Sequence, residues 1–255
     1  MTDWSGRDYA EVSGLQRAMI IDAMAAVTFS RGEWVLDIGC GDGFLTRAMA
    51  ELVPDGYVVG ADASPRMISA ASAAVTTSSG PHFVVADARR LPFGACFDVV
   101  VSFNALHWVP QQALALAQVA AILKPGGRAT LQLVSACARE SLESVAMRIC
   151  QSPSWAAYFT AFDPPFSHPD PEGYGALAAS AGLRCSDVTV ADHEWDFGSR
   201  EAFQRWCGVG LTAWTDRLPP ADRDRFVADA VTAYEPIAGR PGLFHFTQMR
   251  AELVR

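Results

Sequence analysis

The sequence lacks long hydrophobic runs, clusters of basic residues and closely spaced cysteine pairs. No apolar stretch approaches the roughly 18–20 residues that a membrane-spanning helix needs, so no membrane span is expected. The 20 Lys and Arg residues are scattered and are outnumbered by 28 Asp and Glu residues, which gives a formal net charge of -8. A nucleic-acid partner is therefore not expected, because binding a phosphate backbone needs a clustered basic face.

Metal-binding and secretion signals are also missing. The six cysteines contain no CxxC pair and the five histidines show no metal-like grouping, so no metal site is expected. The N-terminus does not have the basic and then apolar segments of a signal peptide. We therefore expect free thiols in a cytoplasmic protein.

What the sequence does contain is an alternation of strand and helix signals. With 255 residues, half of them hydrophobic, the chain can bury a sizeable core as one domain or as one domain with a cap. Near-continuous apolar strands separated by helices imply a parallel sheet that is covered on both faces. Strands are expected at 34–38, 57–62, 82–87, 97–103 and 128–134, with helices at 44–53, 64–75 and 111–123.

The second half of the chain departs from this rhythm. A helix at 171–181, a strand at 183–195, two helical segments within 199–235 and a strand at 246–254 are expected there. We expect residues 1–30 to form an N-terminal helical lid, with its helix at 8–28, and residues 31–135 to form the ligand-binding core. Segments 136–170 and 197–242 are expected to be helical cap insertions, while 171–196 and 243–255 complete the sheet.

The stretch WVLDIGCGDGF, residues 34–44, places three glycines directly after a short apolar strand. A strand followed by Gly-x-Gly-x-Gly and a helix can turn sharply and present bare N–H groups to a ligand. Such spacing serves NAD, flavin and S-adenosylmethionine sites, and also tight turns without a ligand. Acids at the next strand ends sharpen the prediction, because Asp62 is placed to bind a ribose diol and Asp87 to bind an adenine amine.

Together these segments resemble the motifs of class I S-adenosylmethionine-dependent methyltransferases. The matching stretches are DIGCGDG (37–43), ADAS (61–64) with Met67, VVADARRLPF (84–93), FDVVVSFNALHWV (97–109) and LKPGG (123–127). The resemblance implies a Rossmann-like α/β fold, with a seven-stranded mostly parallel sheet, helices on both faces and an antiparallel last strand. The Gly-x-Gly-x-Gly spacing differs from the Gly-x-Gly-x-x-Gly of dinucleotide sites, which disfavours NAD.

The resemblance also implies where S-adenosylmethionine binds. The methionine end would border the glycine loop, the ribose would contact Asp62, and the adenine would contact Met67, Asp87 and the Ala88 amide. The complete expected set is Asp37, Gly39, Gly41, Gly43, Asp62, Ala63, Met67, Asp87, Ala88 and Asn104.

Two segments carry candidate residues for the methyl acceptor: Asn104-Ala105-Leu106-His107-Trp108 and the N-terminal Tyr9 to Gln16. The Trp108 indole and the Gln16 amide are neutral donors that suit two carboxylate oxygens. In this pairing the sequence resembles carboxyl methyltransferases that act on salicylate, benzoate and juvenile hormone acid, and more loosely those that act on trans-aconitate. By that resemblance Gln16 and Trp108 hold the carboxylate, His107 orients it, and Tyr9 lines the substrate site. Equally, Trp108 and His107 can be structural residues of the core.

Ten aromatic residues in the late segments predict an apolar cap, and most of them are expected in its core. They are Trp155, Tyr158, Phe159, Phe162, Phe166, Trp195, Phe197, Phe203, Trp206 and Trp214. A tricarboxylate would need several arginines in its pocket, so an aromatic or aliphatic acid is favoured. The sequence thus predicts a monomeric or homodimeric enzyme that forms the methyl ester of a small hydrophobic acid. The alternatives are an O- or N-methyltransferase with His107 as base, and a non-catalytic cofactor-binding protein.

Overall fold

The computed structural model describes residues 15, 19, 23–25, 27–76 and 80–255. Seven strands form one sheet in the order β3-β2-β1-β4-β5-β7-β6. β1 to β5 pair in parallel, and β7 runs antiparallel to both β5 and β6, which confirms the predicted fold. The strands are β1 (Trp34–Ile38), β2 (Tyr57–Asp62), β3 (His82–Val85), β4 (Phe97–Phe103), β5 (Leu123–Val134), β6 (Arg184–Asp196) and β7 (Leu243–Val254).

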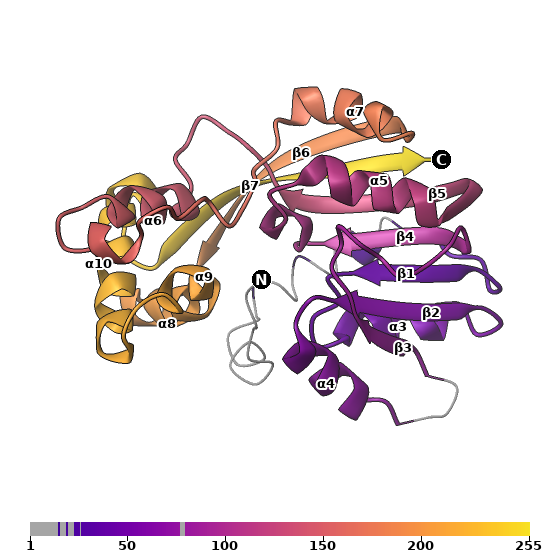
Figure 1. Ribbon diagram of the computed structural model, residues 1–255, viewed down its shortest axis with the longest axis horizontal. Coiled ribbons are helices and arrows are strands. Elements are labelled where there is room, and N and C mark those ends of the chain that lie inside the picture. Colours follow the sequence, from indigo (N-terminus) through magenta and orange to yellow (C-terminus); the bar gives the residue numbers. More distant parts are fainter. Residues whose placement is uncertain (1–14, 16–18, 20–22, 26, 77–79) are drawn as a thin grey trace.

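Helices cover both faces of this sheet (Figure 1). Successive residues of β4 point to opposite faces, so Val100 packs with α5 (Gln112–Ile122) and α7 (Pro171–Ser180). On the other face, Val99 and Val101 pack with α3 (Phe44–Leu52) and with Ala23 of the N-terminal segment. Helix α4 (Pro65–Ala73) packs beside β2 and β3.

A second group of helices packs around the far ends of β6 and β7, beyond the sheet (Figure 1). We call this group the cap; it consists of α6 (Leu142–Cys150), α8 (Arg200–Gly210), α9 (Thr212–Thr215) and α10 (Pro220–Ala238). Its centre holds large buried aromatics, including Trp155, Trp214 and Tyr234. The Tyr234 hydroxyl accepts from the His245 amide and donates to the His245 carbonyl, at 3.1 and 3.0 Å, which ties α10 to β7. The division of the chain into lid, core and cap remains a prediction.

The sequence predicted the start of α4 correctly but not the start of β5. Ser64 caps α4 by accepting from the Met67 amide at 3.2 Å, and Pro65 occupies the first turn, as predicted. The KPGG stretch, expected as a turn before the fifth strand, instead belongs to β5, which begins at Leu123. The pairing of β4 with β5 shifts register between Phe97 and Val99, and this irregularity absorbs the two glycines.

The predicted leading helix at 8–28 falls largely outside the described residues, of which 15, 19 and 23–25 are helical. Tyr9 and Gln16 also lie outside them. Among the described helices, none is long and apolar enough to cross a membrane.

Candidate functional site

The loop after β1 is tied to the end of β2. The amides of Gly39 and Cys40 both donate to the Ala61 carbonyl, at 2.7 and 3.1 Å. Gly39 has φ +76°, and a Cβ placed on it would lie 2.1 Å from the Cβ of Ala105. Only glycine fits this position, because both the backbone conformation and the neighbouring chain exclude a side chain.

Asp37 and Gly43 lie on the side of this loop that packs against the protein interior. Asp37 is 2% exposed and accepts a hydrogen bond from the Thr46 hydroxyl at 2.6 Å. Burial raises the pKa of Asp37 to about 7, and the nearby Asp62 carboxylate adds to the shift. Gly43 has φ +72°, and a Cβ there would lie 2.5 Å from the ring of Phe83. Both residues therefore shape the loop from within the protein.

The two acids at the next strand ends are held by defined partners. One Asp62 oxygen accepts from the Gly41 amide at 3.0 Å and the other from the Ser64 amide at 2.8 Å, so Asp62 joins the loops after β1 and β2. The Asp87 carboxylate accepts hydrogen bonds from the Arg89 guanidinium at 2.6–3.0 Å and from the Arg89 backbone amide at 2.9 Å. These bonds hold the pKa of Asp87 below its usual range, which keeps it ionised at neutral pH.

These strand ends open onto a cleft of about 490 Å³, hereafter the cleft. All the predicted cofactor residues line it except Asp37 and Gly43. Further lining residues that no motif had marked come from α9 and from the loops that border the cap: Phe162, Pro165, Ala213, Asp216 and Arg217. The Arg217 guanidinium lies over the Phe162 ring, 4.9 Å from its centroid. The cleft is thus bounded by the sheet edge on one side and by the cap on the other.

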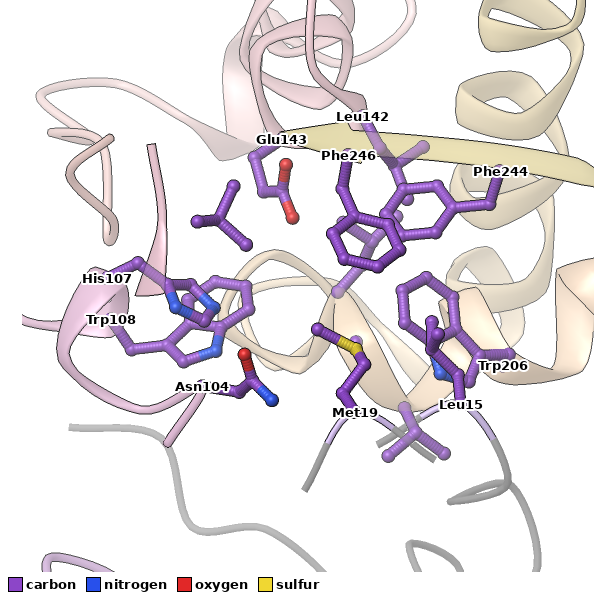
Figure 2. Close-up of a pocket in the computed structure, with 14 residues that line it drawn as sticks. Leu15, Met19, Asn104, His107, Trp108, Leu142, Glu143, Trp206, Phe244 and Phe246 are labelled. Atoms are coloured by element: carbon purple, nitrogen blue, oxygen red, sulfur yellow. The ribbon is translucent and has the colours of Figure 1, made fainter. Parts of the chain in front are cut away.

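A smaller cavity of about 90 Å³, the inner cavity, adjoins the cleft and shares Asn104 and Trp108 with it. Its walls are mostly apolar, and no Lys or Arg lines it within the described part of the chain. Figure 2 shows the Glu143 carboxylate pointing into this space from the side opposite Asn104. The lining residues are Leu15, Met19, Asn104, His107, Trp108, Val134, Leu142, Glu143, Trp206, Val209, Gly210, Leu211, Phe244 and Phe246.

Asn104 stands where the cleft and the inner cavity meet. Its backbone has φ +57°, a conformation that asparagine tolerates better than most residues. The Asn104 side-chain oxygen accepts from the Gln248 amide at 2.6 Å, which leaves its NH2 group as a donor. This NH2 nitrogen is buried and has no hydrogen-bond partner among the residues that the structure describes. The bond from Gln248 therefore orients Asn104 so that its NH2 group is an available N–H donor at the junction.

His107 is part of the wall of the inner cavity and is a buried neutral ring. It is 5% exposed, and burial lowers its pKa to about 3, with a smaller contribution from His168. Its ring centroid lies 5.1 Å from that of Trp108 and 6.3 Å from that of His168. A base with so low a pKa removes protons poorly at neutral pH, so the geometry does not support His107 as a general base.

Known proteins are similar to the part of the chain that holds the parallel strands and, in some cases, to nearly all of it. A family described as a methyltransferase domain matches residues 35–127. Trans-aconitate 2-methyltransferase of Methylobacterium radiotolerans is 28% identical over 247 residues, covering 92% of this chain and 92% of the relative. The YcgJ protein from Bacillus subtilis has a similar structure, with a TM-score of 0.66 at 19% identity, covering 94% of this chain and 98% of that chain.

Residues 35–127 are a class I S-adenosylmethionine-dependent methyltransferase domain, and the chain is a methyltransferase. Its cofactor is S-adenosylmethionine. A further structural neighbour, phosphoethanolamine N-methyltransferase 2 of Haemonchus contortus, was solved in complex with S-adenosyl-L-methionine. That structure has a TM-score of 0.62 at 18% identity and covers 98% of this chain and 56% of its own.

The cleft of this methyltransferase fits the cofactor. At Gly41 a Cβ would meet no atom within 4 Å, so the loop backbone faces open space. Asp62 and Asp87 supply carboxylates at neighbouring strand ends, where we expect them to bind the nucleoside. When bound, the cofactor supplies an electrophilic methyl group. The roles of the individual residues remain predictions.

Sequence reasoning missed two residues of the methyltransferase site, Glu143 and Gln248. Gln248 follows Asn104 by 144 residues, and only the pairing of β5 with β7 brings them together. Glu143 lies in the first turn of α6, within a segment that carries no recognisable motif. The only signal in the sequence was that Glu143 stands among the apolar residues on one face of this helix.

Proposed function

We propose that this methyltransferase forms the methyl ester of a small, mostly apolar carboxylic acid. The main support is the Asn104 NH2 group at the junction of the cleft and the inner cavity. This group is buried and has no hydrogen-bond partner among the described residues. The Trp108 ring lines the same junction. A carboxylate placed there would find the Asn104 NH2 group as a hydrogen-bond donor for one of its oxygens.

For carboxyl methylation the protein mainly has to position the acid relative to the methyl group. A carboxylate is already ionised at pH 7, so no base is needed, in keeping with the neutral His107. Neutral donors orient the acid without the strong ground-state binding that a salt bridge would give. The acid oxygen takes the methyl group while the carbon–sulfur bond breaks, and no proton is transferred.

The relatives and the lining of the inner cavity together limit which acids are plausible substrates. The Methylobacterium relative is named for trans-aconitate, which supports a carboxylate acceptor. Trans-aconitate carries three carboxylates, however, and the described lining of the inner cavity contains no Arg or Lys to bind them. We therefore favour an acid with one carboxylate and an apolar body.

A second candidate is methyl transfer to a hydroxyl or an amine. One observation favours it: the Glu143 carboxylate faces the inner cavity and is placed to accept a proton from such a group. The two candidates differ in their product, because an ester is cleaved by alkali whereas a methyl ether or methylamine is not.

Asn104→Asp is expected to impair acid methylation selectively. The change keeps the side-chain size and the oxygen that accepts from Gln248, but it replaces the NH2 donor with a negatively charged oxygen. Loss of a hydrogen bond to a charged group is worth about 1.5–3 kcal/mol, so KM for the acid should rise at least tenfold. Steady-state kinetics measure this change, and calorimetry with S-adenosylhomocysteine measures cofactor affinity in the same variant.

Gln151→Glu serves as the matched control, because it adds one negative charge on the exposed end of α6, away from both cavities. It should leave KM for the acid unchanged. An unaltered KM in Asn104→Asp would remove the main support for a carboxylate at this junction.

A further inference from the structure

Glu143 is a buried carboxylate without a matching partner. It is 8% exposed, and its oxygens make no hydrogen bond to any residue that the structure describes. The closest basic atom in the described ranges is His168 Nε2, 3.9 Å away, which is too far for a hydrogen bond. Burying a carboxylate in this way is unfavourable unless something pairs with it. A partner from outside the chain would remove that penalty.

The surroundings of Glu143 do not supply the missing charge. Burial lowers the pKa of His168, although Glu143 opposes the shift, so the His168 ring is not a ready cation. The position of Glu143 in the first turn of α6 lets the helix dipole offset part of the cost. That effect is modest, and the helix N–H groups do not reach the oxygens that face the inner cavity.

The remaining walls of the inner cavity suit a cation. Trp206, Phe244 and Phe246 form a contiguous aromatic wall, with ring centroids 4.9 Å apart for Trp206 and Phe244 and 5.4 Å for Phe244 and Phe246. Figure 2 shows the Phe246 ring nearest the Glu143 carboxylate, with Phe244 and Trp206 beyond it. Aromatic faces attract ammonium groups, and a carboxylate next to them adds a direct ionic partner. A hydroxyl group would fill the same place but would leave the carboxylate charge uncompensated.

We propose that the methyl acceptor is a compact amino acid whose ammonium group binds Glu143 and whose carboxylate is the group methylated. This inference rests on the proposed function and names its substrate class. Glu143 and Asn104 lie on opposite sides of the inner cavity, so the two ends of the substrate would be separated by a short apolar spacer (Figure 2). The cavity volume of about 90 Å³ restricts that spacer to a few carbon atoms. Glu143 is then a specificity-determining residue.

The test compares matched acids that differ only in charge at the far end. Unbranched ω-amino acids of three to six carbons are each paired with the alkanoate in which a methyl group replaces the ammonium. For the purified full-length protein we expect kcat/KM to be at least tenfold higher for the best amino acid than for its paired alkanoate. Glu143→Gln should abolish this preference by lowering kcat/KM for the amino acid, while the alkanoate is methylated as well as before or better.

Glu140→Gln is the matched control variant. Glu140 lies three residues earlier, is partly exposed and pairs with Arg148 at 3.1 Å, so its loss removes the same charge outside the inner cavity. It should keep the wild-type preference. Cofactor affinity and the thermal midpoint are measured for both variants, which shows whether each one is folded.

The other outcomes are distinguishable. If the wild type methylates alkanoates as well as amino acids, and Glu143→Gln changes neither, the inference is wrong and the proposed function stands. If Glu143→Gln stops turnover of both series equally, Glu143 serves the reaction as such and the inference is again wrong. If neither series is methylated but an alcohol or a phenol is, the proposed function fails and takes the inference with it.

Discussion

Gly39→Ala is expected to abolish cofactor binding and to destabilise the protein. An L-residue at φ +76° costs about 1–2 kcal/mol, and a Cβ placed 2.1 Å from the Cβ of Ala105 must push the loop or the start of η1 (Leu106–Trp108) aside. Overpacking of this kind costs about 1–3 kcal/mol more. The displaced loop also carries Gly39 and Gly41, which line the cleft. Urea unfolding and calorimetry with S-adenosylhomocysteine measure the two effects.

Gly182→Ala separates the backbone cost from the clash. Gly182 has φ +87°, follows α7 far from the cleft, and would place its Cβ in open space. This variant should lose about 1–2 kcal/mol of stability and keep full cofactor affinity. Wild-type affinity in Gly39→Ala would show that the glycine loop does not form the cofactor site.

Asp37→Asn is expected to stabilise the ligand-free protein at alkaline pH. Burial raises the pKa of Asp37 from 3.8 to about 7, so between these values the folded state holds a proton that the unfolded state has released. Stability of the wild type therefore falls as pH rises from about 4 to about 7, by about 4 kcal/mol in total. Asparagine has no proton to lose, so the advantage of the variant should be absent near pH 4 and complete above pH 7.

Thr46→Val provides the opposite change. The Thr46 hydroxyl donates to Asp37 and opposes the rise in its pKa, so removing it should extend the loss of stability to higher pH and make the total loss larger. Urea unfolding from pH 4 to pH 8 measures all three proteins. If the difference between Asp37→Asn and wild type does not change with pH, Asp37 is ionised throughout and the cost of its burial is met in another way. Calorimetry with the cationic cofactor then reports whether the gain in stability comes at the expense of binding.

The parallel half of the fold was predictable because its signals are local. Apolar strands, glycine turns and caps such as Ser64 with Pro65 are written within a few residues of the element they define. The KPGG stretch was misread because the register shift that absorbs it depends on the neighbouring strand β4. The same limit applies to Asp37 and Gly43, which share the motif but face the interior rather than the cleft.

The substrate side of the site was less accessible from sequence. Asn104, His107 and Trp108 were marked because they follow a strand end where such sheets bind ligands. Their partners come from the cap and from β7, whose positions depend on long-range packing rather than on local pattern. Gln248, which bonds Asn104, and Glu143, which lines the inner cavity, therefore became visible only when the chain was folded.

The nature of the bond to the transferred methyl group decides whether this enzyme methylates carboxylates. The enzyme is incubated with isotopically labelled S-adenosylmethionine and a panel of small acids, alcohols, phenols and amines, and the labelled product is then treated with mild alkali. We predict that the label leaves as methanol, as it does from a methyl ester. A labelled product that withstands alkali, together with no labelled ester from any acid, would contradict carboxyl methylation.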